Sequence, residues 1–354
     1  MKLDGRHALL AAAGLGVLGV RLARQGREAP LDGQVAVVTG GSRGLGLLVA
    51  RELGGRGCHL ALLARDADEL ELASADLRAG GVREVLTVPC DVGDQGQVSQ
   101  AVNAVVDRFG RIDVLVNNAG VITVGPLASM TLEDFAEAMA VMYWGLVYPT
   151  LLVLPHMRRR GTGRIVNITS IGGKVSVPHL LPYSSAKFAA VGFSEGLRAE
   201  LAGSGISVTT VVPGLMRTGS HVNAMFHGDA EHEYTLFSLA ASLPVISMDA
   251  ERAARRIVRA ARRGEAEVTL GLPAVSLALA HGLAPGLTAS GLGLVNRMLP
   301  KDPTPIPAPG RDVDARLHSS ALTALTTLGR RAAYRFGQTE SGQEAPPWRG
   351  NPSL

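Results

Sequence analysis

Short apolar runs alternate with longer segments of helical periodicity from residue 31 to residue 272. The runs have the length of strands, and the segments between most of them are long enough for helices. They read QVAVVTG, HLALLAR, VLTVPC, IDVLVNN, GRIVNITS, ISVTTVVP and EVTLG. This alternation predicts an α/β fold in which a doubly wound parallel sheet of about seven strands carries helices on both faces.

The first 30 residues contain the apolar run ALLAAAGLGVLGV, which has basic residues on both sides. Its roughly 13 residues are fewer than the ~20 that span a bilayer comfortably, and no convincing cleavage site for a signal peptide follows it. A short or monotopic membrane anchor and a helix docked on the protein remain as alternatives. The basic flanks and the apolar character all round favour the anchor, with the alternating region of residues 31–272 on the cytoplasmic side.

Beyond the alternating region, residues 273–300 form an apolar C-terminal extension. Residues 301–354 are polar and rich in proline, as in KDPTPIPAPG and SGQEAPPWRGNPSL. Such a composition is typical of disorder, so we expect a disordered tail.

Composition narrows the function classes. The 354 residues are 46% hydrophobic, enough for a large core, and carry a modest net charge of +4. With 4% aromatic residues, the chain does not suggest a nucleic-acid surface with stacking platforms. Cys58 and Cys90 fit no metal-ligand spacing and no disulfide framework, so we expect buried thiols in a reducing compartment and no metal site. Whether the chain forms a homo-oligomer stays open.

The first predicted strand runs into TGGSRGLG, where Gly40, Gly44 and Gly46 lie between strand and helix. Glycine permits a tight turn there and lets backbone N–H groups approach a pyrophosphate at the positive end of the helix. In the first βα unit of such a sheet, this spacing indicates a Rossmann-type dinucleotide site.

Later in the chain, YSSAK opens a predicted helix from about Tyr183 to Leu201. Residues four apart share a helix face, so Tyr183 and Lys187 lie side by side. Because this spacing often arises by chance, the pair on its own favours an ordinary solvated helix.

Five separated motifs decide between these interpretations: TGxxxGxG at Thr39 to Gly46, NNAG at 117–120, Ser170 after a strand, YSSAK, and PGLMRTG at 213–219. Together, over about residues 31–272, they resemble the classical short-chain dehydrogenase/reductase family. The resemblance implies an oxidoreductase that interconverts a carbonyl and an alcohol by hydride transfer, with Ser170, Tyr183 and Lys187 as the catalytic group. Tyr183 would exchange the proton if its pKa were drawn toward neutral by Lys187 and the oxidised nicotinamide.

The resemblance also assigns cofactor contacts. In addition to Tyr183 and Lys187, the cofactor-binding positions would be Gly40, Ser42, Arg43, Gly44, Leu45, Gly46, Arg65, Asp91, Val92, Asn117, Pro213 and Thr218. At the end of the second strand the chain reads LLARD, with Ala64 where an NAD-preferring member has an acid and Arg65 next. These features, with Arg43, favour NADP(H), and NAD(H) stays possible.

One position departs from the family pattern, because Met142 stands where many members carry an asparagine of the proton relay. A dinucleotide-binding sensor that has lost turnover is therefore the alternative to an enzyme. Another alternative to an enzyme is a membrane-bound assembly protein that binds partners through its apolar ends.

The loop after PGLMRTG predicts the substrate class. Phe226, Tyr234, Leu236, Phe237 and Leu239 suggest an apolar pocket for a lipid-like, steroid-like or aromatic carbonyl. The three histidines of this loop, His221, His227 and His232, are expected to be solvated rather than bound to a metal.

Overall fold

The computed structural model describes residues 28–317 and 319–339. The anchor expected around residues 8–20 and the end of the chain from residue 340 lie outside these ranges. The N-terminal anchor therefore stays a prediction.

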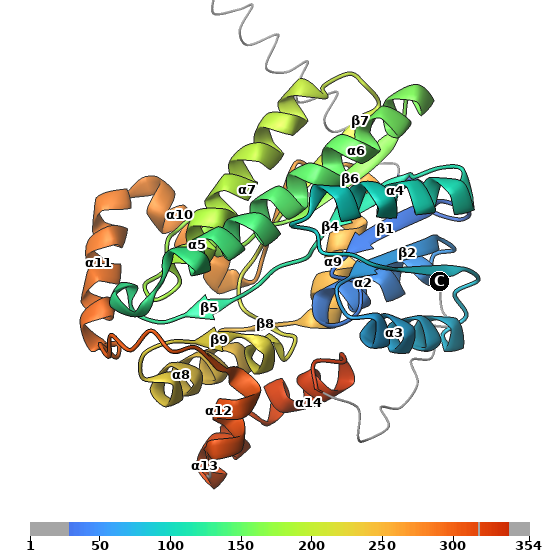
Figure 1. The fold of residues 1–354 in the computed structure, drawn as a ribbon. Coiled ribbons are helices and arrows are strands. Elements are labelled where there is room, and N and C mark those ends of the chain that lie inside the picture. Colours follow the sequence, from blue (N-terminus) through green and yellow to red (C-terminus); the bar gives the residue numbers. More distant parts are fainter. Residues whose placement is uncertain (1–27, 318, 340–354) are drawn as a thin grey trace, which may run out of the picture.

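A parallel sheet of seven strands forms the centre of the described part, in the order β11-β7-β6-β4-β1-β2-β3 (Figure 1). These strands are β1 (Val35–Thr39), β2 (His59–Ala64), β3 (Val85–Pro89), β4 (Val114–Asn117), β6 (Gly163–Ile168), β7 (Ile206–Pro213) and β11 (Glu267–Leu270). All seven runs of the predicted pattern form strands of this sheet, which confirms the doubly wound fold.

Two helical layers cover the sheet, one on each face (Figure 1). On one face lie α2 (Gly44–Gly54), α3 (Ala67–Ala79) and α9 (Ala250–Arg263), and on the other α4 (Gln95–Phe109), α6 (Gly145–Arg160) and α7 (Leu181–Glu200). Successive strand residues alternate between the layers: Ala36 and Val38 join the core under α2 and α9, whereas Val35 and Val37 join the core under α4 and α6. Both faces of the sheet are therefore shielded from water, as the uniformly apolar strands require.

The strand order reverses beside β1, whose neighbours are β2 and β4. In open parallel sheets, ligands bind at such a reversal, outside the carboxyl ends of the strands. The glycine-rich turn between β1 and α2 lies at this end, and so do the segments after β4, β6 and β7. The topology thus brings four of the five sequence motifs to one edge.

Shorter elements surround this edge. They are β5 (Thr123–Val124), η1 (Leu127–Ser129), α5 (Leu132–Met139), the π-helical turn η2 (Ala140–Trp144), η3 (Ile171–Gly173), β8 (Met216–Arg217), η4 (Ser220–Asn223), β9 (Met225–Phe226), α8 (Ala230–Ser242) and β10 (Met248–Asp249). Strands β8 and β10 pair with each other, and β5 pairs with β9.

After β11 the chain forms a helical hairpin of α10 (Leu272–Leu283) and α11 (Pro285–Met298) that projects from the side of the molecule (Figure 1). Its large apolar side chains are exposed; Leu272, Leu283 and Met298 are each more than 80% exposed. The apolar extension of residues 273–300 is therefore ordered in helices, with most of its apolar surface uncovered.

The expectation of a disordered tail is wrong for residues 308–317 and 319–338. They form β12 (Ala308–Pro309), α12 (Gly310–Arg316), α13 (Ser320–Leu325) and α14 (Thr327–Arg335), which pack beside α8 and β8. We call residues 308–338 the C-terminal strap. Its small and apolar residues, among them Val313, Ala333 and Phe336, are buried against the catalytic domain, and this tertiary packing outweighs a composition that by itself favours disorder.

One helix in the described ranges, Leu132–Arg160, is long and apolar enough to cross a membrane. It comprises α5, η2 and α6, and 56% of its most apolar window is buried inside the protein. This helix packs in the core below the sheet's second face.

Candidate active site

A cleft of about 660 Å³ opens at the carboxyl ends of the strands. Of the sequence-predicted residues, Gly40, Ser42, Arg43, Gly44, Leu45, Arg65, Asp91, Val92, Ser170, Tyr183, Lys187, Pro213 and Thr218 line this cleft. Gly46 and Asn117 do not. The structure therefore brings together almost the whole predicted site.

The glycine loop between β1 and α2 forms one end of the cleft. Gly44 has a φ of +55°, which a residue with a side chain adopts only with strain. Gly46 lies in the first turn of α2, where an added Cβ would overlap the carbonyl oxygen of Gly40. Gly46 thus allows the helix to approach the loop closely and does not itself face the cleft.

Asn117 is a correction to the sequence analysis. It ends β4 with its side chain 3% exposed, and its amide donates to Thr150 Oγ1 at 3.0 Å and to Asn167 Oδ1 at 2.8 Å. The next residue, Asn118, lines the cleft, and its amide donates to the carbonyl oxygens of Thr39 and Gly40. Strand alternation turns Asn117 into the core, so Asn118 is the residue of NNAG that braces the glycine loop.

At the end of β2, Arg65 lies exposed at the cleft wall and makes no hydrogen bond or ion pair with any described residue. Asp66 serves as the N-cap of α3 and accepts the backbone N–H of Glu69 at 2.9 Å. Arg43 donates to Glu69 at 2.6 Å, and the Ser42 hydroxyl donates to the other oxygen of the same carboxylate at 2.8 Å. At this end of the cleft, Arg65 is therefore a cation without a carboxylate partner among the described residues, unlike Arg43.

The adenine end of the cleft follows β3. The Asp91 carboxylate accepts the N–H of Gly93 at 2.9 Å, and the N–H of Asp91 donates to Gln97 at 2.9 Å. Val92 is buried beside it, and Gly145 of α6 can approach because it lacks a Cβ. These contacts hold Asp91 and Val92 as a fixed wall of the cleft.

Ser170, Tyr183 and Lys187 meet at the centre of the cleft. Ser170 follows β6, and its hydroxyl accepts the N–H of Gly172 at 3.0 Å. Tyr183 and Lys187 lie on α7, one helical turn apart, with Lys187 Nζ 5.8 Å from the centre of the Tyr183 ring. Lys187 is 4% exposed and donates to the carbonyl oxygen of Ile168 at 2.9 Å.

Burial governs the acid-base properties of this group. It lowers the pKa of Lys187 to about 8, because an ammonium loses hydration inside the protein. Burial also raises the pKa of Tyr183, and the contact with the Ser170 side chain opposes that rise. The protein groups alone therefore do not draw the Tyr183 pKa toward neutral, and the joint effect of Lys187 and the oxidised nicotinamide stays a prediction.

The profile of the family described as short chain dehydrogenase matches residues 34–225, which include the glycine loop and the catalytic group. The chain belongs to the short-chain dehydrogenase/reductase family. A curated relative, dehydrogenase/reductase SDR family member 7B of Bos taurus, is 34% identical over 259 residues, which cover 72% of this chain and 78% of the relative. The protein is accordingly an NAD(P)-dependent oxidoreductase, as the motifs predicted.

Two solved structures resemble this dehydrogenase/reductase. L-sorbose reductase from Gluconobacter frateurii, complexed with NADPH and L-sorbose, is 26% identical with a TM-score of 0.62, over 69% of this chain and 97% of that one. A variant of actinorhodin polyketide ketoreductase with NADPH is 33% identical with a TM-score of 0.59, over the same shares. The likeness ends short of the full chain, so the neighbours leave almost a third of this protein uncovered.

Met142 distinguishes this dehydrogenase/reductase from the usual family pattern. It lies in the π-helical turn η2, is 2% exposed, and packs with Ala138 and Ala186 against the Tyr183 ring. A thioether replaces an amide at this place, so the wall beside Tyr183 is apolar. Lys187 instead has the Ile168 carbonyl as its polar partner.

The loop and helix after β7 differ from the sequence expectation. Phe226 and Tyr234 are almost completely buried in a core with Val124 and Val313, and Leu236 is 45% exposed, so none of these three lines the cleft. The apolar lining comes instead from Val121, Ile122, Val141, Met216 and Ala224. None of these residues is aromatic, so they carry no signal in the sequence that marks a substrate pocket.

The histidines of this region correct a further expectation. His221 and His227 are buried, at 1% and 2% exposure, whereas His232 is exposed as predicted. Burial lowers the pKa of His221 to about 4. His227 lies 3.3 Å from Asp134, and no cluster of potential metal ligands occurs in residues 28–317 or 319–339.

The structure adds cleft residues that the sequence did not single out, namely Glu69, Asn118, Asn223, Arg311 and Gln338. Arg311 and Gln338 belong to the C-terminal strap. No family motif includes the strap, so only the tertiary fold could reveal their place.

Proposed function

We propose that this protein reduces a carbonyl group on an apolar small molecule with NADPH as the cofactor. The observation that carries the proposal is the convergence of Ser170, Tyr183 and Lys187 in one cleft with the glycine loop and Arg65. NADPH would supply the hydride, and both structural neighbours are complexes with NADPH.

The residues of the cleft fit such a cofactor. The N–H groups of Leu45 and Gly46 in the first turn of α2 are available to a pyrophosphate, whereas the N–H of Gly44 already donates to the Phe336 carbonyl. Arg65, with no acid at Ala64, suits a 2′-phosphate better than a ribose hydroxyl. Lys187, held at the cleft floor by Ile168, is placed to donate to ribose hydroxyls.

The chain's own groups would carry the proton chemistry. The Ser170 hydroxyl would donate to the carbonyl oxygen and stabilise the negative charge that develops on it. Tyr183 would give its proton to that oxygen, which completes the alcohol and leaves a phenolate. The Lys187 ammonium would stabilise this phenolate until a proton from solvent restores the tyrosine. The apolar lining by Val121, Ile122 and Met216 supports an apolar substrate.

A panel of apolar ketones and aldehydes tests the reaction and the cofactor together. The wild type should oxidise NADPH with at least one member, and Arg65→Asp should raise the KM for NADPH about tenfold or more while improving the use of NADH. The reason is that a 2′-phosphate loses its cation and meets a like charge. Steady-state kinetics with both cofactors measure this.

Arg83→Asp is the control for net charge, because Arg83 is exposed before β3 and away from the cofactor cleft. It should leave both KM values within twofold. A wild type that prefers NADH would contradict the assignment of Arg65, and one that reduces no carbonyl would favour the sensor alternative.

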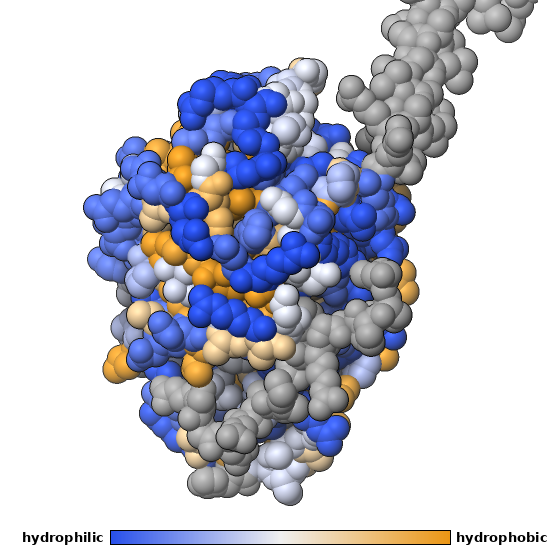
Figure 2. Space-filling model, turned by 90° about the vertical axis from the view of Figure 1, so that its right-hand side faces the viewer, coloured by the Kyte–Doolittle hydropathy of each residue, from blue (hydrophilic) through white to orange (hydrophobic). Residues whose placement is uncertain are grey.

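We further propose that the α10–α11 hairpin contacts a lipid bilayer. Residues 272–296 contain no Asp, Glu, Lys or Arg, and the exposed leucines include Leu279, Leu283, Leu287 and Leu294. The opposite side of the molecule is shown in Figure 2, where hydrophilic side chains border a hydrophobic band. On α3 of that side, Leu72 is an exposed large apolar residue. The hairpin would be a second membrane signal beside the expected N-terminal anchor.

The double variant Leu283→Glu/Leu287→Glu should bind vesicles of phosphatidylcholine and phosphatidylglycerol about tenfold more weakly than the wild type in a flotation assay, because two charges would enter the apolar contact. Leu72→Glu, on the opposite side, should bind as the wild type does. If the double variant floated with vesicles as well as the wild type does, the bilayer contact of the hairpin would be refuted. If Leu72→Glu lost as much vesicle binding as the double variant, added negative charge alone would explain the loss.

A further inference from the structure

The C-terminal strap returns from the hairpin to the glycine loop. Strand β12 pairs antiparallel with β9, and the N–H of Gly310 donates to the carbonyl oxygen of Ala224 at 2.8 Å. From there α12, α13 and α14 lead along α8 toward the phosphate end of the cleft (Figure 1). The strap thereby places residues from the far end of the sequence at the first βα turn.

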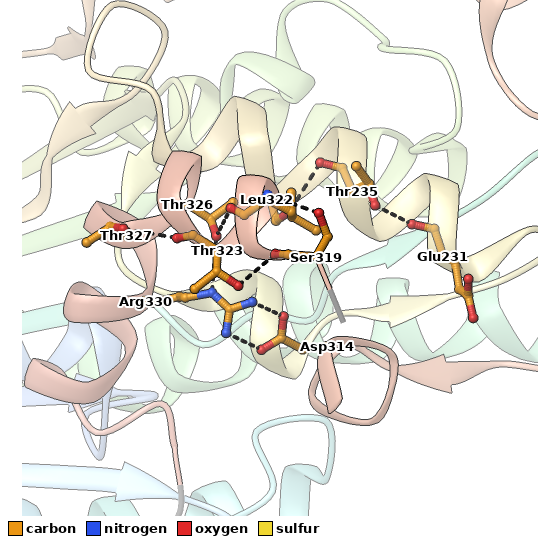
Figure 3. A network of polar contacts seen from close by, with 10 residues as sticks. Glu231, Thr235, Asp314, Ser319, Leu322, Thr323, Thr326, Thr327 and Arg330 are labelled. Atoms are coloured by element: carbon orange, nitrogen blue, oxygen red, sulfur yellow. Dashed lines mark hydrogen bonds and ion pairs between the residues drawn. The ribbon is translucent and has the colours of Figure 1, made fainter. Parts of the chain in front are cut away.

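Polar contacts within the strap hold its three helices together (Figure 3). Arg330 of α14 forms a two-point ion pair with Asp314 of α12, at 2.7 and 2.5 Å. Ser319 caps α13, and Arg330 also donates to the Thr326 hydroxyl at 3.1 Å. Such a forked arginine contact fixes orientation as well as distance.

Close packing attaches the last helix to the domain. A Cβ on Gly219 would overlap Ala333, so α14 lies directly on the backbone of the segment after β8. Phe336 is 4% exposed and belongs to the same core as α2 and α9. The end of the strap is therefore part of the hydrophobic core of the catalytic domain.

The strap makes two kinds of polar contact at the glycine loop. The carbonyl oxygen of Phe336 accepts the N–H of Gly44 at 2.8 Å. The Asn223 amide donates to Gln338 twice, to the backbone oxygen at 2.9 Å and to the side-chain Oε1 at 2.7 Å. Because Oε1 is the acceptor in this pair, Nε2 is the end of the Gln338 amide that faces Gly44.

The Gln338 side chain has an unpaired hydrogen-bond donor. Gln338 is 9% exposed and lines the cleft, yet its NH₂ group has no hydrogen-bond partner among residues 28–317 and 319–339. Gly44, the first residue of α2, lies next to it. The N–H groups of Leu45 and Gly46 follow, before the first helical hydrogen bond of α2, from Leu47 N to Arg43 O. The positive end of a helix and a buried amide donor thus face the same space.

We propose that Gln338 binds the pyrophosphate of the cofactor, so that the C-terminal strap completes the cofactor site. This inference rests on the proposed NADPH-dependent function and adds a phosphate-binding residue to it. Glu69 already engages Arg43 and Ser42, so a neutral amide held by Asn223 provides a donor that no carboxylate neutralises. The Gln338 amide would donate to a phosphate oxygen beside the first turn of α2.

Direct binding titrations test this assignment without turnover. Gln338→Ala should raise the Kd about tenfold for NADPH and for ADP-ribose, which both contain a pyrophosphate, and change the Kd for adenosine 2′-monophosphate less than twofold. Gln338→Glu keeps the length and the acceptor for Asn223 but presents a carboxylate to the phosphates, so it should weaken NADPH and ADP-ribose further. Leu325→Ala, exposed on the same strap, is the matched control and should bind all three ligands normally.

Each outcome decides something. Unchanged NADPH affinity in both Gln338 variants with an intact thermal transition would overturn the assignment. Tighter binding in Gln338→Ala would also overturn it, because it would mean that the amide excludes the pyrophosphate. Equal weakening of adenosine 2′-monophosphate would point to a general collapse of the cleft, against a pyrophosphate contact. A wild type that binds none of the three ligands would instead contradict the proposed function.

Discussion

The Tyr183→Phe variant is expected to reduce carbonyl substrates at least a thousandfold more slowly than the wild type, because it loses the proton donor of the reaction. Its NADPH affinity should stay within about twofold. The phenyl ring keeps the packing against Met142 and Ala186, and Lys187 remains bound to Ile168. Single-turnover hydride transfer and a fluorescence titration of NADPH measure the two properties separately.

Met142→Asn is the matched control for a change in the same wall of the cleft. It adds the amide that many family members carry and should alter the rate about tenfold or less. If Tyr183→Phe kept most of its activity, another group would have to supply the proton. An inactive wild type beside an active Met142→Asn variant would identify the protein as a sensor that had lost turnover.

Lys187→Met should abolish most turnover and change how stability depends on pH. Burial lowers the Lys187 pKa from 10.5 to about 8 in the folded protein, so the unfolded chain binds more protons between these values. Wild-type stability therefore carries the full cost of the buried charge below about pH 8, and this cost diminishes as the pH rises toward 10.5. At neutral pH the lowered pKa corresponds to about 3 kcal/mol.

Chemical unfolding of both proteins at pH 7 and pH 10 measures this effect. From pH 7 to pH 10 the wild type should gain about 2 kcal/mol relative to Lys187→Met, which has no titratable group at position 187. The absolute difference at pH 7 is smaller than the charge cost, because methionine leaves the Ile168 carbonyl without its donor. If the difference in unfolding free energy between the wild type and Lys187→Met did not change with pH, the assignment of Lys187 as a buried, charged group would be refuted.

The sheet and the proximity of Tyr183 to Lys187 could be predicted because local signals specify them, whereas the catalytic role of this pair is inferred from the resemblance to the family. A strand buried on both faces needs an uninterrupted apolar run, and the i, i+4 spacing alone sets Tyr183 beside Lys187 on α7. Asn117 was assigned wrongly because a motif of two asparagines does not say which one faces the cleft. The burial of Asn117 at the end of β4 follows from the strand's alternation and from its partners Thr150 and Asn167.

The strap could not be predicted, because its folding depends on surfaces distant in sequence. Its helices are short and its composition polar, so local propensity favours disorder. What stabilises it is the fit of Ala333 on Gly219 and of Phe336 in the core beside α2. For the same reason, the burial of Phe226 and Tyr234 under Val313 was hidden: the residue that covers them comes from the strap.

The hydrogen bond from Gly44 to Phe336 joins residues about 290 positions apart in the chain. At translation rates of roughly 5 to 20 residues per second, the glycine loop emerges from the ribosome about 15 to 60 s before its partner. Strands β1 to β7 can pair during that interval, but the turn after β1 lacks its hydrogen bond to Phe336 until α14 and Phe336 have been synthesised. During synthesis, the apolar surface of α2 that contacts Phe336 therefore stays uncovered until the strap has been made.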